Sequence, residues 1–120
     1  MCPKEAKVFV AEDEEKWHEN YRIGLDEEGH KIFVNVYDLK EGLSSIPEAK
    51  KLGINVALID GRLPYDAEDG NKLAGALREA IPEIKIVDIS GFGDAIKNPD
   101  AVMAKSKFKI FELGKLVTDL

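Results

Sequence analysis

The stretch Val56–Asp60 reads VALID, and it decides the fold class of this chain. Its first four residues are all apolar, with no alternation between apolar and polar positions. Such a run is typical of a strand that is buried on both faces of a parallel sheet. The carboxylate of Asp60 would then stand at the carboxyl end of a central strand, which is the edge where open α/β sheets bind their ligands.

Strands and amphipathic helices alternate on both sides of this stretch. The apolar spacing of Trp17, Tyr21 and Leu25 predicts a first helix, with Asp13 as its N-cap and Gly29 at its end. We predict strands over 7–11, 32–36, 56–59, 84–89 and 101–104. Further helices are predicted over 39–49 (disturbed at Pro47), 73–80 and 108–120.

This alternation predicts an α/β protein, namely a flavodoxin-like, doubly wound, five-stranded parallel sheet with helices on both faces. The segment Phe92–Pro99 contains glycine and proline breakers and is too short for a full helix, so the fourth helix should be truncated. The length of 120 residues suits one domain, and no linker is visible. We therefore expect a single domain over 1–120 without an output domain.

The composition of the chain argues against nucleic acid and membrane as binding partners. The net charge of −6 argues against direct binding of nucleic acid, which requires clustered Lys and Arg. No apolar run is long enough to insert into a membrane, and the N-terminus lacks an apolar signal core. The single cysteine fits a reducing compartment, so we expect the chain to be cytoplasmic.

Polar residues with complementary chemistry follow four of the predicted strands. They are Glu12 and Asp13, then Asp60, then Ser90, then Lys105. If the sheet is parallel, all five converge on one edge, where three crowded carboxylates repel one another unless a cation lies between them. Mg²⁺ prefers such oxygen ligands, and a lysine ammonium suits a phosphoryl oxygen. Metal, cation and nucleophile together are what phosphoryl transfer requires.

The segments 10–14, 58–64, 89–91 and 104–108 resemble the four signature blocks of response-regulator receiver domains, and the likeness extends from Lys7 to Leu120. The resemblance implies that Asp60 accepts a phosphoryl group from a sensor histidine kinase or a histidine phosphotransfer protein. It implies a signalling domain whose own chemistry is limited to phosphotransfer and autodephosphorylation. Its output would be an interaction with a downstream protein that the sequence does not name.

The same resemblance assigns the other site residues. Asp13 would bind Mg²⁺ directly, Glu12 directly or through water, and the backbone carbonyl of Arg62 would be a further ligand. Lys105 would pair with the phosphoryl group, and Ser90 would form a hydrogen bond to it.

Several departures leave alternatives open. Lys105 follows Ser90 by only 15 positions, fewer than usual in the family, and Val102 stands where an aromatic switch residue is common. These features favour a pseudo-receiver, that is, the same fold used as a phosphorylation-independent interaction module. A metal-dependent phosphatase is a weaker alternative, because the second acid that such enzymes place two residues after the nucleophile is replaced by Arg62.

The aromatic and histidine residues receive structural assignments. We expect Trp17 and Tyr21 to be core or half-buried helix residues. His18 and His30 are expected to face solvent or the end of the first helix, with no function, since neither has the spacing of a metal ligand.

Overall fold

Five parallel strands form one sheet in the order β2-β1-β3-β4-β5. The computed structural model describes residues 5–61, 63, 66, 68–91 and 96–120. The strands are β1 (Lys7–Ala11), β2 (Lys31–Val36), β3 (Val56–Ile59), β4 (Lys85–Asp88) and β5 (Ala101–Val102). Strand order reverses between β1 and β3, so the flavodoxin-like order predicted from the sequence is confirmed, and the switch point lies where these two strands end.

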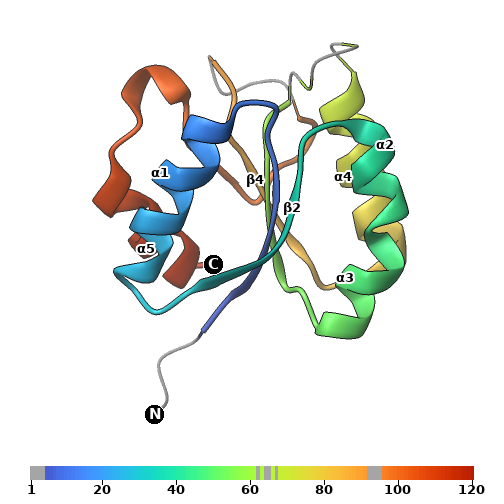
Figure 1. The fold of residues 1–120 in the computed structure, drawn as a ribbon, viewed down its shortest axis with the longest axis horizontal. Helices are drawn as coiled ribbons and strands as arrows, with labels where there is room; N and C mark the ends of the chain where they lie inside the picture. The colour runs from blue at the N-terminus through green and yellow to red at the C-terminus, as the bar shows by residue number, and fades with distance from the viewer. Residues whose placement is uncertain (1–4, 62, 64–65, 67, 92–95) are drawn as a thin grey trace.

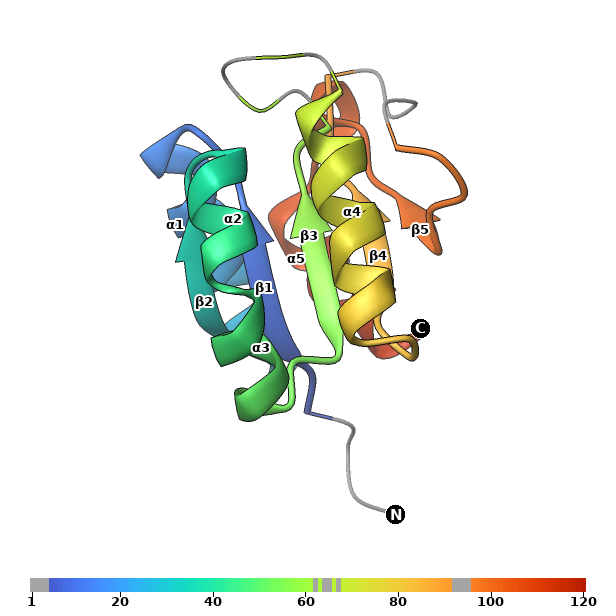
Figure 2. The same cartoon turned by 90° about the vertical axis from the view of Figure 1, so that its right-hand side faces the viewer.

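Helices cover both faces of the sheet. Helices α1 (Glu15–Asp26) and α5 (Ile110–Thr118) pack on one face (Figure 1). The other face carries α2 (Leu39–Ser44), α3 (Ile46–Leu52) and α4 (Asp69–Ala80), which stand in front of the sheet in Figure 2. No helix in the described part of the chain is both long and apolar enough to cross a bilayer.

The central strand explains the VALID stretch. All four residues of β3 are buried. Ala57 and Ile59 belong to the core beneath α2, α3 and α4, whereas Val56 and Leu58 belong to the core beneath α1 and α5. Because both faces of β3 are covered, the strand contains no polar position until Asp60.

Helix boundaries follow local chemistry. The predicted second helix is two helices that meet at Ser45, with Pro47 in the first turn of α3, where a missing N–H costs nothing. Gly53 ends α3 with a φ of 76°, a left-handed conformation that glycine adopts without steric cost. The N-cap of α1 is Glu14, one residue after the predicted Asp13. Helix α4 begins at Asp69, four residues before the first apolar position on which the prediction relied.

The sequence predicts a truncated helix between β4 and β5, and the described residues of this segment agree with that prediction. Between β4 and β5, the described residues 89–91 and 96–100 form no helix. The second of these stretches is instead tied down by side chains. Asp88 Oδ2 accepts a hydrogen bond from the Ile96 N–H (3.1 Å), and Asn71 Oδ1 accepts one from the Lys97 N–H (2.8 Å). Arg78 on α4 donates to the carbonyls of Lys97 and Asn98.

The C-terminal boundaries differ from the prediction as well. Strand β5 ends at Val102 rather than at Ala104, and the chain then forms a 3₁₀ helix over Lys105–Lys107. Helix α5 begins at Ile110, two residues later than predicted. The 3₁₀ turn brings Lys105 back toward the sheet edge, as described below.

Helices α1 and α5 touch through backbone, and this contact yields a stability prediction. A Cβ added at Gly24 would overlap the carbonyl oxygen of Ile110, and one at Gly114 would lie 2.6 Å from the carbonyl oxygen of Gly24. Gly24→Ala should therefore force the helices apart and lower the free energy of unfolding by about 2 kcal/mol, the usual scale of overpacking. Urea denaturation measures this.

Gly75→Ala is the matched control. Gly75 lies on the exposed side of α4, and a Cβ there would meet nothing within 4 Å. This substitution should stabilise the protein by roughly 0.5 to 1 kcal/mol, because alanine loses less entropy than glycine in a helix. Equal effects of the two substitutions would contradict the close helix contact.

Candidate functional site

The predicted site residues meet at the carboxyl edge of the sheet. Hydrogen bonds continue the parallel ladder past the strand ends, since the Asp60 N–H donates to the Ala11 carbonyl (2.9 Å) and the Lys105 N–H donates to the Ser90 carbonyl (2.8 Å). Residues that are widely separated in the sequence are thereby fixed side by side. Glu12 is tied to β2 in the same way, through its N–H and the Val36 carbonyl (3.1 Å).

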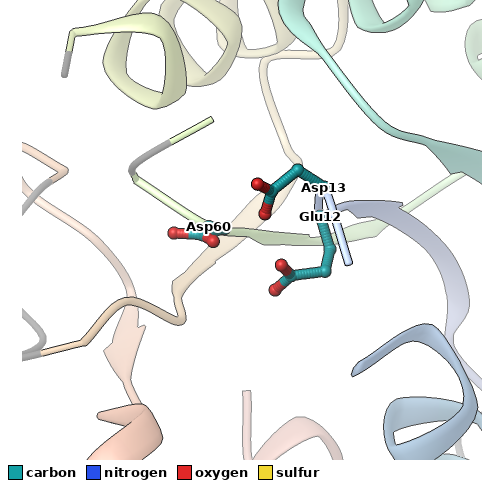
Figure 3. A group of neighbouring side chains, drawn as sticks. All are labelled: Glu12, Asp13 and Asp60. Carbon is teal, nitrogen blue, oxygen red and sulfur yellow. The ribbon is translucent and has the colours of Figure 1, made fainter. Parts of the chain in front are cut away.

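Three carboxylates cluster at this edge. Glu12, Asp13 and Asp60 each offer one oxygen, and these oxygens all lie within 4.8 Å of one another (Figure 3). Glu12 and Asp60 are buried, while Asp13 is exposed. An all-oxygen set of this kind suits a hard divalent cation, and the exposed side leaves the cluster accessible from solvent.

Lys105 supplies positive charge within the cluster. Its Nζ lies 2.8 Å from Glu12 Oε1 and 2.9 Å from Asp60 Oδ2. The lysine side chain is only 16% exposed, so this ammonium is a largely buried partner and not a solvated surface charge. Three carboxylates and one ammonium leave an excess of negative charge, which a divalent cation would offset.

Glu12 is the most deeply buried of the three acids. Its Oε1 also accepts a hydrogen bond from the Tyr21 hydroxyl (2.8 Å), and its Oε2 accepts one from the Glu14 N–H (3.3 Å). Burial raises the pKa of Glu12 to about 7, against the lowering effect of the Lys105 hydrogen bond, and the charge of Asp60 raises it further. When no metal ion is bound, the Glu12 carboxyl therefore takes up a proton near neutral pH.

The neighbours of Glu12 respond to the same charges. Burial, and then the Glu12 carboxylate, raise the pKa of Tyr21, so its hydroxyl stays a donor. Burial alone would lower the pKa of Lys105, but its hydrogen bonds to Glu12 and Asp60 outweigh this and raise it. The ammonium is thus charged at any physiological pH.

The remaining predicted residues have different outcomes. Ser90 is buried at the same edge, and its backbone carbonyl holds Lys105 as described above. Arg62, whose carbonyl is the predicted further metal ligand, lies outside the described residues.

The expectation that the histidines face solvent was wrong. His18 and His30 are both buried, with exposed fractions of 5% and 1%. His18 contacts the Glu12 carbonyl through Nε2 and Asn35 Oδ1 through Nδ1, each at 2.7 Å. His18 precedes Tyr21 by three residues and Leu25 by seven, so helical spacing could have placed it on the inner face.

His30 has a structural role that no local pattern indicates. Its Nδ1 accepts a hydrogen bond from the Ala6 N–H (3.0 Å), and its Nε2 lies 2.8 Å from Thr118 Oγ1. The ring therefore joins the start of β1 to the end of α5. Its partners are 24 and 88 residues away, so only tertiary packing brings them to it.

Comparison with known proteins adds independent evidence on the fold. No family model matches the sequence, and no curated protein matches it. Solved structures do match. A CheY-like response regulator receiver domain protein from Methanospirillum hungatei has 19% identity and a TM-score of 0.76, with 97% of this chain and 93% of the other covered.

Two further structures extend this result. A response regulator from Thermotoga maritima has 17% identity and a TM-score of 0.77, with 97% of both chains covered. A response regulator protein from Burkholderia pseudomallei, solved with a phosphorylated aspartic acid, a calcium ion and citrate, has 18% identity and a TM-score of 0.72, with 91% of this chain and 64% of the other covered. The resemblance noted in the sequence is confirmed for the architecture: this chain has the fold of a response-regulator receiver domain.

Proposed function

We propose that this chain is a phospho-accepting receiver domain, with Asp60 as the acceptor. The observation that carries the proposal is the contact of Asp60 with Lys105 beside Glu12 and Asp13, since it combines a carboxylate nucleophile, a cation and an oxygen-rich metal site. The Burkholderia pseudomallei neighbour, whose structure contains a phosphorylated aspartic acid and a calcium ion, supports it. The donor would be a sensor histidine kinase or a histidine phosphotransfer protein.

The transfer itself is a simple displacement. A carboxylate oxygen of Asp60 attacks the phosphorus of a phosphohistidine, and an O–P bond forms as the P–N bond breaks. The electron pair of the broken bond stays on the imidazole, which leaves as a neutral ring because its other nitrogen carries a proton when the P–N bond breaks. Lys105, which already contacts Asp60, would then pair with the phosphoryl oxygens, and Ser90, which is buried at the same edge, would donate a hydrogen bond to them.

The residues present fit Mg²⁺. The carboxylates of Glu12, Asp13 and Asp60 would hold the ion. The Arg62 carbonyl would be the additional ligand that the family resemblance implies. When bound, the ion offsets negative charge between the carboxylates and the incoming phosphoryl oxygens. Phosphorylation should therefore depend on Mg²⁺. The test is incubation with acetyl phosphate, with and without Mg²⁺, followed by intact mass measurement.

A phosphorylation-independent interaction module is the second candidate. Val102 on β5 is 44% exposed, and a valine there cannot perform the inward turn of an aromatic switch residue. The described residues between β4 and β5 also form no helix, in keeping with the short Ser90–Lys105 spacing that favours this alternative. The mass measurement separates the two candidates, because an interaction module of this kind would gain no phosphoryl group.

The affinity for Mg²⁺ should depend on pH. Because burial raises the pKa of Glu12 to about 7, this carboxyl is mostly protonated at pH 6 and mostly ionised at pH 8. A metal ion binds the ionised form, so the affinity should rise severalfold between these two pH values. Fluorescence of Trp17, the single tryptophan of the chain, can follow the titration.

Glu12→Gln provides the control for this prediction. The amide cannot titrate, so the variant should bind Mg²⁺ more weakly and with little change between pH 6 and pH 8. An equally steep rise in the variant would show that another group controls the pH dependence.

A further inference from the structure

The Lys105 ammonium has a third neighbour, which is not an acid. Its Nζ lies 4.9 Å from the centroid of the Trp17 ring, while the same atom contacts Glu12 and Asp60. A cation within about 6 Å of an indole face is attracted by the ring's negative electrostatic potential. This contact comes from α1, whereas Lys105 follows β5, so it exists only in the folded chain.

We propose that Trp17 is a positioning residue, whose ring face holds the Lys105 ammonium beside Asp60 before a phosphoryl group arrives. This inference rests on the proposed function, because the position matters through the reaction at Asp60. The two carboxylate partners of Lys105 change when a metal ion or a phosphoryl group binds them. The indole ring has no ionisable group and binds neither the metal ion nor the phosphoryl group. It can therefore remain in contact with the ammonium before and after phosphorylation.

The ring is itself held in place by other aromatic side chains. Trp17 stacks on Tyr21 at a centroid distance of 5.9 Å and packs against Phe108 in a T-shaped arrangement at 5.2 Å, with an interplanar angle of 88°. Tyr21 and Phe108 also contact each other, at 5.7 Å. Three rings in mutual contact leave Trp17 little freedom to rotate, so its face stays directed toward Lys105.

This aromatic cluster connects both sides of the site. Phe108 directly follows the 3₁₀ helix that contains Lys105, and Tyr21 donates the hydrogen bond to Glu12 Oε1. The rings therefore support the lysine backbone, the lysine ammonium and one of its acidic partners. Ordinary hydrophobic packing would explain the ring contacts alone, and the test must separate that role from attraction to the cation.

The sequence allows a test that changes the ring's electrostatics while nearly preserving its shape. Trp17 is the only tryptophan, so biosynthetic incorporation of fluorinated tryptophan alters this position alone. Fluorine withdraws electron density from the ring face and weakens cation–π attraction. A tryptophan with one ring fluorine and another with several give a graded series.

The first readout is phosphorylation by acetyl phosphate in the presence of Mg²⁺. We expect its second-order rate constant to fall progressively with fluorination, by about twofold to fivefold at the highest level, which is the factor that a cation–π contact of ordinary strength implies. In a Lys105→Met background, fluorination should have no effect on the residual rate. A flat series with Lys105 present, or equal decreases in both backgrounds, would overturn the proposal in favour of simple packing.

The second readout does not depend on phosphorylation. Fluorination should lower the urea midpoint of the Lys105 protein and leave that of Lys105→Met nearly unchanged. If the unmodified protein gains no phosphoryl group at all, the proposed function fails. The urea comparison then still decides whether Trp17 holds Lys105, and equal midpoint changes in the two backgrounds would refute the contact itself.

Discussion

Asp60→Asn should abolish phosphorylation by acetyl phosphate, whereas the unchanged protein gains the mass of one phosphoryl group in the presence of Mg²⁺. An amide is a far poorer nucleophile than a carboxylate, and it also removes one anionic metal ligand. Asp60 is buried, contacts Lys105 at 2.9 Å and directly follows β3, so it has both the strand-end position and the neighbouring cation expected of an acceptor. Intact mass measurement should show a decrease of at least about a hundredfold in the rate of labelling.

Asp66→Asn is the matched control for this experiment. Asp66 is an exposed acid a few residues after Asp60, and its Oδ1 accepts a hydrogen bond from the nearby Glu68 N–H. This variant should be labelled at the unchanged rate. If Asp60→Asn remains folded and is still labelled at the wild-type rate, the acceptor is another residue and the assignment of Asp60 is wrong.

Lys105→Met should lower the rate of phosphorylation by about a hundredfold. The Lys105 ammonium contacts Asp60, and it would pair with the phosphoryl oxygens as charge develops on them. Removal of a single donor that stabilises transition-state charge typically costs 10² to 10³ in rate. Methionine keeps most of the aliphatic length of lysine, so packing against the ring of Trp17 is largely preserved.

The same substitution should also destabilise the protein, and more strongly at high pH. Without Lys105, Glu12 and Asp60 are two buried carboxylates with no cation between them, a loss of about 3 kcal/mol. The pKa of Glu12 is already raised by burial, and the Lys105 hydrogen bond is what lowers it. In the variant, the folded state therefore takes up a proton on Glu12 more readily, so low pH relieves the repulsion and high pH exposes it.

Urea denaturation at pH 6 and pH 8 measures this difference. Lys107→Met is the control, since Lys107 lies on the same 3₁₀ helix but is exposed, and its loss should change stability by less than about 0.5 kcal/mol. Mg²⁺ should restore part of the stability of Lys105→Met by offsetting the charge of the acids. A variant that is equally stable at both pH values would contradict the role of Lys105 in balancing buried charge.

The sequence by itself determined the architecture and the members of the acidic site. An apolar run without alternation, such as Val56–Ile59, has one stable environment in a domain of this size, a strand covered on both faces. Breakers such as Gly53 act through their own backbone geometry, so their effect is local and readable. Convergence of Glu12, Asp13 and Asp60 followed from parallel pairing alone, because parallel strands end at the same edge.

Only the tertiary structure decided how these residues are charged and held. A lysine after a short strand looks like a surface residue, but Lys105 is largely buried against two acids and an indole ring because three elements meet around it. His30 shows no local sign of burial in the sequence but is buried in the folded chain. Helical and strand periodicities arise from neighbours a few residues apart, whereas burial, pKa and partner choice depend on contacts between residues far apart in the chain, which local patterns do not encode.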